Sequence, residues 1–212
     1  EASRAAGVPK FVYVSSSEVY GTAKWVPRNE DHPTFPYTVY GGPKLAGEAY
    51  TRAFSRTYGY PTVVVRPFNT YGPRQSARAV IPTIISQIAS GKRKIRLGAV
   101  SPTRDFSFVT DTARGLIAGL TAPAEQTVGQ TINLGSGFEI SVGATATMIA
   151  EVMQADLEIE TDEARLRPAN SEVERLWADN SKARQQLGWS PEFGGLDGMR
   201  RGLEKTAQWF MD

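Results

Sequence analysis

Short apolar runs and an amphipathic stretch alternate along the first third of the chain. Residues 11–14 (FVYV) and 62–65 (TVVV) are almost continuously apolar, and a helical pattern runs between them from about Val39 to Tyr58. Apolar strands joined by a helix are typical of a parallel sheet covered by helices on both faces. Two such strands alone would leave unpaired apolar edges, which soluble proteins avoid. We therefore expect further strands upstream, so that this chain is the C-terminal part of a longer fold.

Beyond Pro67 shorter strands and helices mix. Helices are predicted at 80–90, from Thr110 or Asp111 to about Leu120, from a cap at Ser141 to about Met153, at 179–187 and at 195–210. Strands are predicted at 94–97, 105–109, 131–135 and 157–161. The helix that ends near Leu120 is expected to bury Leu116, Ile117 and Leu120. The predicted fold class is α/β, a doubly wound parallel sheet with a smaller α/β lobe interleaved with it.

Composition narrows the possible functions. The 212 residues contain no cysteine and one histidine, and the formal net charge is +2. Without cysteine there is no disulfide or thiol nucleophile, and a single histidine argues against zinc or another metal site. The small, scattered charge gives no sign of a nucleic-acid partner. No apolar run approaches the length of about 18 residues that a spanning helix needs, and no signal peptide is recognisable. We expect a cytoplasmic protein without a membrane partner.

A tyrosine and a lysine provide the first candidate chemistry. Tyr40 and Lys44 stand four residues apart in YGGPK, so at the start of a helix they share one face. A tyrosine hydroxyl ordinarily titrates near pH 10, and a neighbouring ammonium group favours its deprotonated form. The spacing alone also fits an exposed helix pair. Two polar segments, 14–21 (VSSSEVYG) and 66–74 (RPFNTYGPR), directly follow apolar strands, at the sheet edge where ligands bind in open α/β folds.

Taken together, these motifs resemble the extended short-chain dehydrogenases/reductases of the NAD-dependent epimerase/dehydratase family, which act on nucleotide sugars. The match extends through 104–111 (RDFSFVTD), 133–137 (NLGSG), 167–179 (RPANSEVERLWAD) and 187–191 (LGWSP), and so covers nearly the whole chain.

The resemblance implies a domain organisation and partners. Residues 1–78 would be the C-terminal half of a Rossmann-type NAD-binding domain that carries the catalytic residues. Residues 79–212 would mainly form the nucleotide-sugar-binding lobe, interleaved with the sheet. NAD is the implied cofactor, a nucleotide sugar the substrate, and a homodimer the assembly. The glycine-rich phosphate loop of the family has no counterpart in these residues, and we expect it upstream of Glu1.

The resemblance also assigns roles to individual residues. Tyr40 corresponds to the base that takes the proton of the sugar O4 hydroxyl, Lys44 to its activator, which also holds the nicotinamide ribose, and Ser16 to a hydrogen-bond partner of the same hydroxyl. Cofactor contacts are further implied for Ser15, Pro67 and Phe68. Substrate contacts are implied for Ser17, Asn69, Arg74, Pro82, Arg104 and Arg167. For the two last arginines, which would bind phosphates, surface ion pairs with Asp105 or Glu172 are the alternative.

The run Ser16-Ser17-Glu18 bears on the reaction. Epimerases of the family resemble Ser-Ala-Thr here, whereas elimination of water needs a base for the C5 proton, and Glu18 supplies a carboxylate. Ser17 departs from 4,6-dehydratases that carry Asp, but resembles GDP-mannose dehydratases and UDP-glucuronate decarboxylases. The remaining motifs look most similar to 4,6-dehydratases of legionaminic-acid-type pathways.

We therefore expect an NAD-dependent nucleotide-sugar 4,6-dehydratase whose catalytic residues are Ser16, Glu18, Tyr40 and Lys44. A 4-epimerase, a UDP-glucuronate decarboxylase and a non-catalytic fragment or remnant that binds nucleotide sugar are the alternatives.

The only histidine and the first turn of the catalytic helix also give expectations. His32 lies in the Pro-rich segment 29–36 (NEDHPTFP), and is expected to be a solvent-exposed loop residue. Gly41, Gly42 and Pro43 stand where the family more often has small polar residues. Because proline is tolerated in a first helical turn, the catalytic helix can still begin near Val39.

Overall fold

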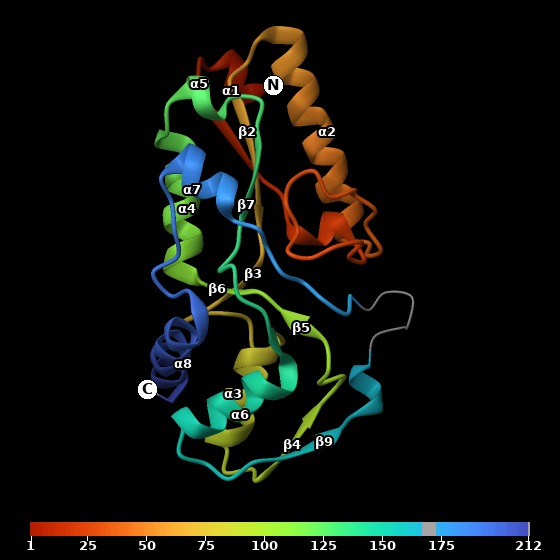
Figure 1. The fold of residues 1–212 in the computed structure, drawn as a ribbon, viewed down its shortest axis with the longest axis vertical. Helices are drawn as coiled ribbons and strands as arrows, with labels where there is room; N and C mark the ends of the chain where they lie inside the picture. The colour runs from red at the N-terminus through yellow and green to blue at the C-terminus, as the bar shows by residue number, and fades with distance from the viewer. Residues whose placement is uncertain (167–172, 212) are drawn as a thin grey trace.

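A computed structural model describes residues 1–166 and 173–211 (Figure 1). The elements in chain order are α1 (Ala2–Ala5), β1 (Phe11–Val14), the 3-10 helix η1 (Ser17–Tyr20), α2 (Gly41–Tyr58), β2 (Thr62–Pro67), β3 (Asn69–Tyr71), α3 (Val80–Ala89), β4 (Lys94–Leu97), β5 (Thr103–Arg104), β6 (Phe106–Phe108), α4 (Val109–Thr121), α5 (Ala124–Thr127), β7 (Thr131–Leu134), β8 (Ile140–Ser141), α6 (Val142–Val152), β9 (Glu158–Thr161), the 3-10 helix η2 (Glu163–Arg165), α7 (Ser181–Leu187) and α8 (Gly195–Met211). In the described part of the chain, no helix is long and apolar enough to cross a membrane.

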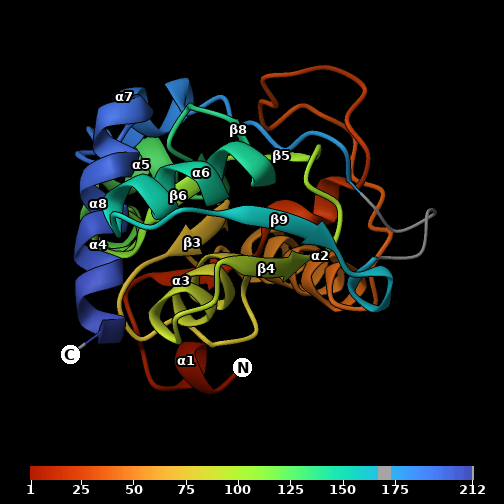
Figure 2. The same ribbon diagram turned by 90° about the horizontal axis from the view of Figure 1, so that it is seen from below.

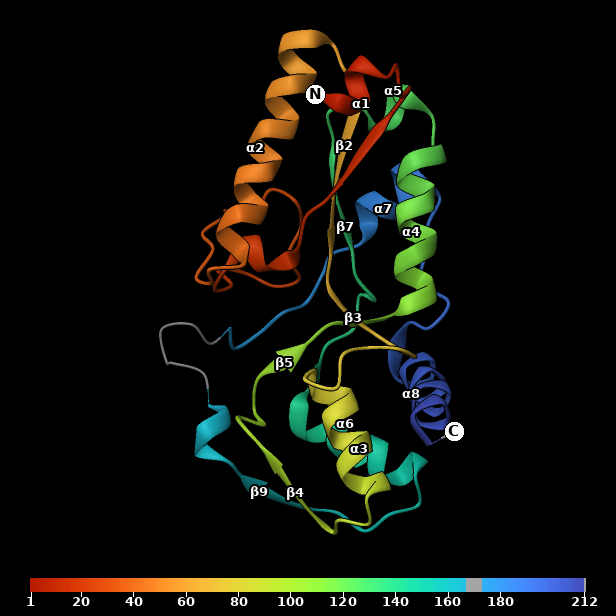
Figure 3. The same ribbon diagram turned by 180° about the vertical axis from the view of Figure 1, so that it is seen from behind.

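A parallel sheet forms the centre of the upper lobe. Its strands run in the order β1–β2–β7, with Phe11 opposite Thr62 and Val64 opposite Thr131. Helix α2 covers one face, and α4 and α7 cover the other (Figures 1 and 3). This arrangement confirms the predicted α/β class and the parallel sheet covered on both faces. β1 and β2 run parallel, so the polar residues after them meet at the same end of the sheet.

The lower lobe has its own core. Helices α3 and α6 pack against each other and against α8, and the parallel pair β4–β9 crosses in front of them (Figure 2). Ile84, Ile95, Ile149 and Leu203 are fully buried there. The predicted cap of α6 is confirmed, because the Ser141 hydroxyl accepts a hydrogen bond from an amide of the first turn.

The chain passes repeatedly between the two lobes. It descends from β2 through β3 to α3, returns from β6 into α4, and descends again from β7 to β8 (Figure 1). It then rises along residues 173–180 to α7 before it ends in α8. Residues 79–212, which the sequence assigned mainly to the smaller lobe, thus also supply β7, α4 and α7 to the lobe that contains the sheet.

Asp105 joins three of the segments that connect the lobes. Its fully buried carboxylate accepts hydrogen bonds from Ser136 N and Oγ, both at 2.7 Å, and from Gly137 N and Ala178 N at 3.1 Å. Burial raises the pKa of Asp105 to about 6, against the opposing effect of these hydrogen bonds. Since Asp105 is buried among backbone donors, the alternative of a surface ion pair between Asp105 and Arg104 is wrong.

The apolar face expected for α4 is wrong for two of its three residues, and only Leu116 of the three packs against the core of the sheet. Ile117 and Leu120 are 60% and 51% exposed, and the buried face of the helix carries glycines instead. A Cβ atom at Gly115 would lie 2.5 Å from a methyl carbon of Leu134. The helix therefore packs on the sheet through its smallest residues, which hydrophobic periodicity does not detect.

Helix α2 begins at Gly41, two residues after the predicted start. Tyr40 already has helical angles, φ −75° and ψ −42°, and the Thr38 hydroxyl accepts a hydrogen bond from Gly41 N at 3.0 Å. The glycine is required by close packing, because a Cβ at Gly41 would lie 2.8 Å from the carbonyl oxygen of Glu18. Gly41 thus allows the start of α2 to lie directly against η1.

Candidate active site

Tyr40 and Lys44 lie where β1 ends. The Lys44 ammonium group donates a hydrogen bond to the carbonyl of Val14, the last residue of β1, at 2.9 Å. It lies 5.6 Å from the centroid of the Tyr40 ring, and Tyr40 is 56% exposed. The pair therefore places an accessible phenol and an ammonium group side by side at the ligand-binding end of the sheet.

Ser16 and Glu18 lie beside the start of the same helix. The Ser16 hydroxyl accepts a hydrogen bond from Glu18 N at 3.2 Å and begins η1. The half-buried Glu18 carboxylate accepts one from the Thr38 hydroxyl at 3.4 Å, and the same hydroxyl accepts a hydrogen bond from Gly41 N, in the first residue of α2. The structure thus gathers a hydroxyl, a carboxylate, a phenol and an ammonium group around the junction of β1, η1 and α2.

Residues predicted to touch the cofactor differ in their exposure. Ser15 is 3% exposed, and its hydroxyl donates to the buried Glu48 at 2.6 Å. Ser17, which was predicted to contact the substrate, is also 3% exposed. Phe68 is also buried, with its ring centroid 6.4 Å from that of Tyr20. Pro67 ends β2 and is only partly buried. The hydroxyl of Ser15 therefore belongs to the protein interior rather than to the exposed edge.

A cavity of about 590 Å³ opens beyond the end of β2, in the lower lobe. Two of the residues that line it, Asn69 and Arg104, were predicted from the sequence as substrate contacts. Arg104 also donates to the carbonyl groups of Thr103 and Val173, at 2.9 and 2.6 Å, which fix its guanidinium group.

The other predicted substrate residues lie elsewhere. Pro82 is buried in the first turn of α3, while its neighbours Ile81 and Thr83 line the cavity. Arg74 is exposed, has a positive φ of 66° and is not a lining residue. Arg167 and Glu172 lie outside the described residues.

Three polar residues stand out among the lining residues that were not predicted from the sequence. They are Gln75, Arg78 and Arg165, from the loop before α3 and from η2. Together with Arg104, the two arginines give the cavity three guanidinium groups, which suit an anionic ligand such as a diphosphate. No motif identifies Arg78 or Arg165, and only the fold brings them to Arg104.

A buried arginine, Arg28, belongs neither to the predicted catalytic residues nor to the lining of the cavity. Arg28 is fully buried and donates to the carbonyl of Arg175 at 2.7 Å. Burial lowers the pKa of Arg28 to about 10, with further effects from the charges of Arg104 and Glu18. The charges of Glu18 and of Arg104, which lines the cavity, both act on Arg28.

His32 is not a solvent-exposed residue, which corrects the prediction from the sequence. It is 2% exposed, and its ring lies edge-on to Tyr20, with centroids 5.4 Å apart, and 4.6 Å from the Trp25 ring. Its Nε2 accepts a hydrogen bond from Lys24 N at 2.9 Å, so its Nδ1 carries the proton and donates to Pro33 O at 2.8 Å. Aromatic neighbours from the same loop bury the imidazole in its neutral form.

We expect His32 to make stability depend on pH. Burial lowers the pKa of His32 below its usual value, as do the nearby charges of Arg28 and Lys24. Between that pKa and about 6.5 the unfolded chain binds more protons, so the free energy of unfolding should fall as pH drops below about 6.5. NMR titration of the single imidazole and urea unfolding from pH 5 to 8 measure both effects. A His32→Asn variant should lose this contribution; an imidazole that titrates at or above 6.5 contradicts it.

Comparison with known proteins identifies the family. Residues 1–201 match the family described as GDP-mannose 4,6 dehydratase. The chain is 36% identical to a UDP-glucose 4-epimerase of Mycolicibacterium smegmatis, over 99% of this chain and 65% of that protein. It is 33% identical to a dTDP-glucose 4,6-dehydratase of Neisseria gonorrhoeae, over 96% of this chain and 60% of that protein. The chain thus belongs to this family of nucleotide-sugar epimerases and dehydratases.

A solved structure shows the same fold. The dTDP-glucose 4,6-dehydratase of Bacillus anthracis in complex with NAD superposes with a TM-score of 0.84 at 27% identity, covering 99% of this chain and 64% of that one. This likeness agrees with the Rossmann-type fold and the nicotinamide cofactor expected from the sequence. The chain spans about two thirds of the length of the relatives it matches.

Proposed function

We propose that this chain carries the catalytic residues and the sugar-nucleotide site of an NAD-dependent nucleotide-sugar 4,6-dehydratase. One observation carries the choice of reaction: the Glu18 carboxylate lies beside Thr38, at the start of the helix that holds Tyr40 and Lys44. A carboxylate near the tyrosine supplies the second base that elimination requires and that epimerisation at C4 does not.

Oxidation at C4 is the first step of the proposed reaction. Tyr40 accepts the proton of the sugar O4 hydroxyl, and Lys44, whose ammonium group lies 5.6 Å from the centroid of the Tyr40 ring, stabilises the resulting charge. Ser16 lies at the start of η1, where its hydroxyl orients the same sugar oxygen. Bound NAD would take up the hydride that leaves C4 and later return it to C6.

Elimination of water follows at C5 and C6. The 4-keto group acidifies the C5 proton, and Glu18 accepts it as the C5–C6 double bond forms and the C6 hydroxyl leaves. Protonated Glu18 is the acid that gives this hydroxyl the proton it needs to depart as water. The hydride then returns to C6, and C5 is protonated from solvent while Tyr40 releases the O4 proton to solvent, which completes and balances the formation of a 4-keto-6-deoxy sugar.

The residues present fit one part of NAD. Lys44 and the exposed Tyr40 offer polar groups at the end of β1, where ribose hydroxyls could bind. Pro67 and Phe68, at the end of β2, form the neighbouring turn that would lie beside the nicotinamide. These positions serve the reactive end of the cofactor, next to the phenol that moves the proton.

The cavity supports the proposed substrate class. Arg78, Arg104 and Arg165 would bind the diphosphate of a nucleotide sugar, and Asn69 links this cavity to the end of β2. Residues 1–78 would then provide the catalytic edge and residues 79–212 most of the substrate site.

A homodimer through α2 is part of the proposal. The small residues Ala46, Ala49 and Ala53 are exposed along α2, as is Tyr50. Small exposed side chains allow a second helix to approach closely, and the tyrosine adds apolar area for it to cover.

A product assay tests the proposal. The protein, expressed from its complete coding sequence and loaded with NAD, is incubated separately with UDP-, GDP- and dTDP-activated hexoses. We expect at least one to give a 4-keto-6-deoxy product with loss of water, detected by mass spectrometry. If the protein only binds these compounds, or turns none of them over, the proposed function is wrong.

A 4-epimerase is the second candidate, favoured by the 36% identity to the mycobacterial UDP-glucose 4-epimerase. The same assay separates the two reactions, because an epimerase gives a product of unchanged mass with inverted configuration at C4.

A further inference from the structure

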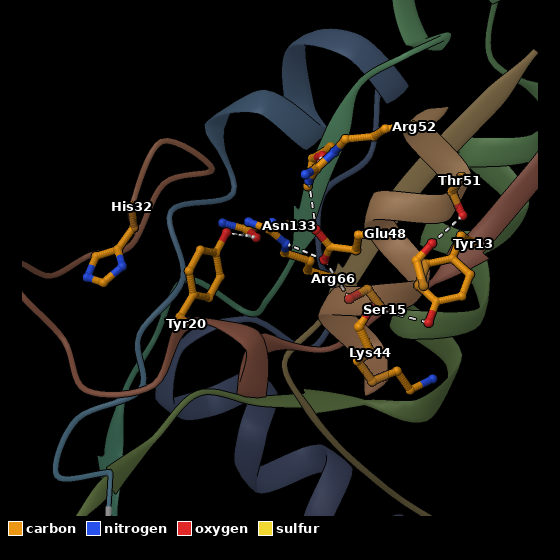
Figure 4. Close-up of polar contacts among 12 residues, drawn as sticks. Tyr13, Ser15, Tyr20, His32, Lys44, Glu48, Thr51, Arg52, Arg66 and Asn133 are labelled. Carbon is orange, nitrogen blue, oxygen red and sulfur yellow. Dashed lines mark hydrogen bonds and ion pairs between the residues drawn. The ribbon is translucent and has the colours of Figure 1, made fainter. Parts of the chain in front are cut away.

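Glu48 is a carboxylate buried in the sheet lobe, one helical turn after Lys44 (Figure 4). It is fully buried, and it accepts a hydrogen bond from the Ser15 hydroxyl at 2.6 Å and two from Arg66 of β2, at 2.8 and 2.7 Å. Arg52, on the next turn of α2, donates another at 2.7 Å from a half-exposed side chain. Both carboxylate oxygens are therefore satisfied by groups from three elements.

Glu48 and Lys44 hold α2 at two consecutive points of the chain. Lys44 donates to the carbonyl of Val14, and Glu48 accepts from the hydroxyl of Ser15, the next residue. Residues four apart lie on one face of a helix, so this face of α2 is joined to the end of β1 directly before Ser16. The third contact, with Arg66, fixes the same face to β2.

The network extends across the whole sheet. The Arg66 guanidinium group lies 4.6 Å from the centroid of the Tyr20 ring, and the Tyr20 hydroxyl donates to Asn133 of β7 at 2.7 Å (Figure 4). Burial alone would raise the pKa of Glu48, but hydrogen bonds and charge from Arg66 outweigh it and lower that pKa. The Glu48 carboxylate is thus held in its charged form. Its contacts with Ser15 and Arg66 can all form only when α2 packs on the sheet in one register.

We propose that Glu48 is a positioning residue for the reaction: by binding Ser15 and Arg66 it sets the place of Tyr40 and Lys44 relative to Ser16. The inference rests on the proposed function, because it assumes that these three groups act on one sugar hydroxyl. Proton transfer depends steeply on the distance between donor and acceptor, and a displacement of about 1 Å can lower a rate about 100-fold. A role in stability alone would leave the reaction rate of the folded molecules unchanged.

Three variants distinguish a positioning role of Glu48 from a role in stability alone. Glu48→Gln removes the charge, and Ser15→Ala removes only the bond to β1 and leaves the pair with Arg66. Arg52→Met is the matched control, because it removes the outer partner of Glu48 but leaves the contacts of Glu48 with Ser15 and Arg66. It also removes the hydrogen bond from Arg52, which lies about two helical turns beyond Lys44, to the Thr131 hydroxyl of β7 at 3.1 Å. The measurement is the first-order rate constant for appearance of reduced cofactor in a single turnover. An unfolded fraction lowers the amplitude of this signal but not its rate constant.

We expect Glu48→Gln to lower the rate constant about 10- to 100-fold and Ser15→Ala to lower it less, with the KM for the nucleotide sugar unchanged. Arg52→Met should match the wild-type protein. A wild-type rate constant in folded Glu48→Gln overturns the inference. If Glu48→Gln does not fold, a wild-type rate constant in Ser15→Ala overturns the inference instead.

Hydrogen exchange gives a second measurement that needs no turnover. The amides of Gly41, Gly42 and Lys44 should exchange faster in Ser15→Ala than in Arg52→Met if the bond to Glu48 holds the start of α2; equal protection contradicts the inference. This result is independent of the reaction. Absence of turnover in the wild-type protein would therefore reject the proposed function, while the exchange data would still decide whether Glu48 holds the helix in place.

Discussion

A Glu18→Gln variant should oxidise its nucleotide sugar at C4 but fail to eliminate water. The amide cannot accept the C5 proton, and loss of a general base typically lowers a rate by about 100- to 10,000-fold. Its size and its contact with the Thr38 hydroxyl are preserved, because the amide oxygen still accepts that hydrogen bond. The reaction should therefore stop after the first step, with reduced cofactor accumulating to one equivalent and no 4-keto-6-deoxy product.

Asp31→Asn is the control for Glu18→Gln. Asp31 is an exposed carboxylate in the segment between η1 and α2, and its removal changes the net charge by the same amount. We expect it to form product at the wild-type rate. Undiminished dehydration by Glu18→Gln would remove Glu18 from the reaction and leave the 4-epimerase as the better assignment.

Replacing Tyr40 by Phe should block the reaction one step earlier. The ring and its place beside Lys44 remain, but no hydroxyl is left to take the O4 proton as the hydride departs. The rate of cofactor reduction should fall about 100- to 10,000-fold. Because Tyr40 is 56% exposed and no hydrogen bond of its hydroxyl is found among the described residues, the free energy of unfolding should change little.

The Tyr40 prediction is measured by stopped-flow reduction of the cofactor and by calorimetric binding of the nucleotide sugar. Tyr50→Phe removes another exposed hydroxyl from the same helix and should leave both unchanged. If Tyr40→Phe binds substrate and reduces the cofactor at the wild-type rate, the proton has another acceptor and the proposed mechanism is wrong.

Most of the helices and longer strands could be predicted from the sequence, because each carries a local signal. The apolar runs of β1 and β2 and the cap at Ser141 are examples. The short strands β3 and β8 were missed, since a pairing such as Asn69 with Phe106 is made by segments far apart in the chain. The burial of α4 was misjudged because close packing selected glycine where periodicity would select leucine.

The candidate site was predictable where its residues lie close together along the chain. Ser16 and Glu18 share one motif, and Tyr40 and Lys44 share another, so spacing alone predicts that each pair is adjacent. The cavity could not be predicted in the same way, because Arg78 and Arg165 come from loops 87 residues apart and only the fold brings them together. The direction of the Ser15 side chain also depends on Glu48, which no motif in the sequence identified.

The repeated passage of the chain between the lobes has a consequence for how a ligand is recognised. Enzymes that close on their substrates do so about hinges of a few residues. Here every connecting segment would have to bend at once, and Asp105 fastens three of them to one another. The distance from the arginines of the cavity to the phenol of Tyr40 is therefore set by the folded chain itself. If the proposed function holds, the protein should select a nucleotide sugar whose length from its diphosphate to its reactive carbon matches that distance.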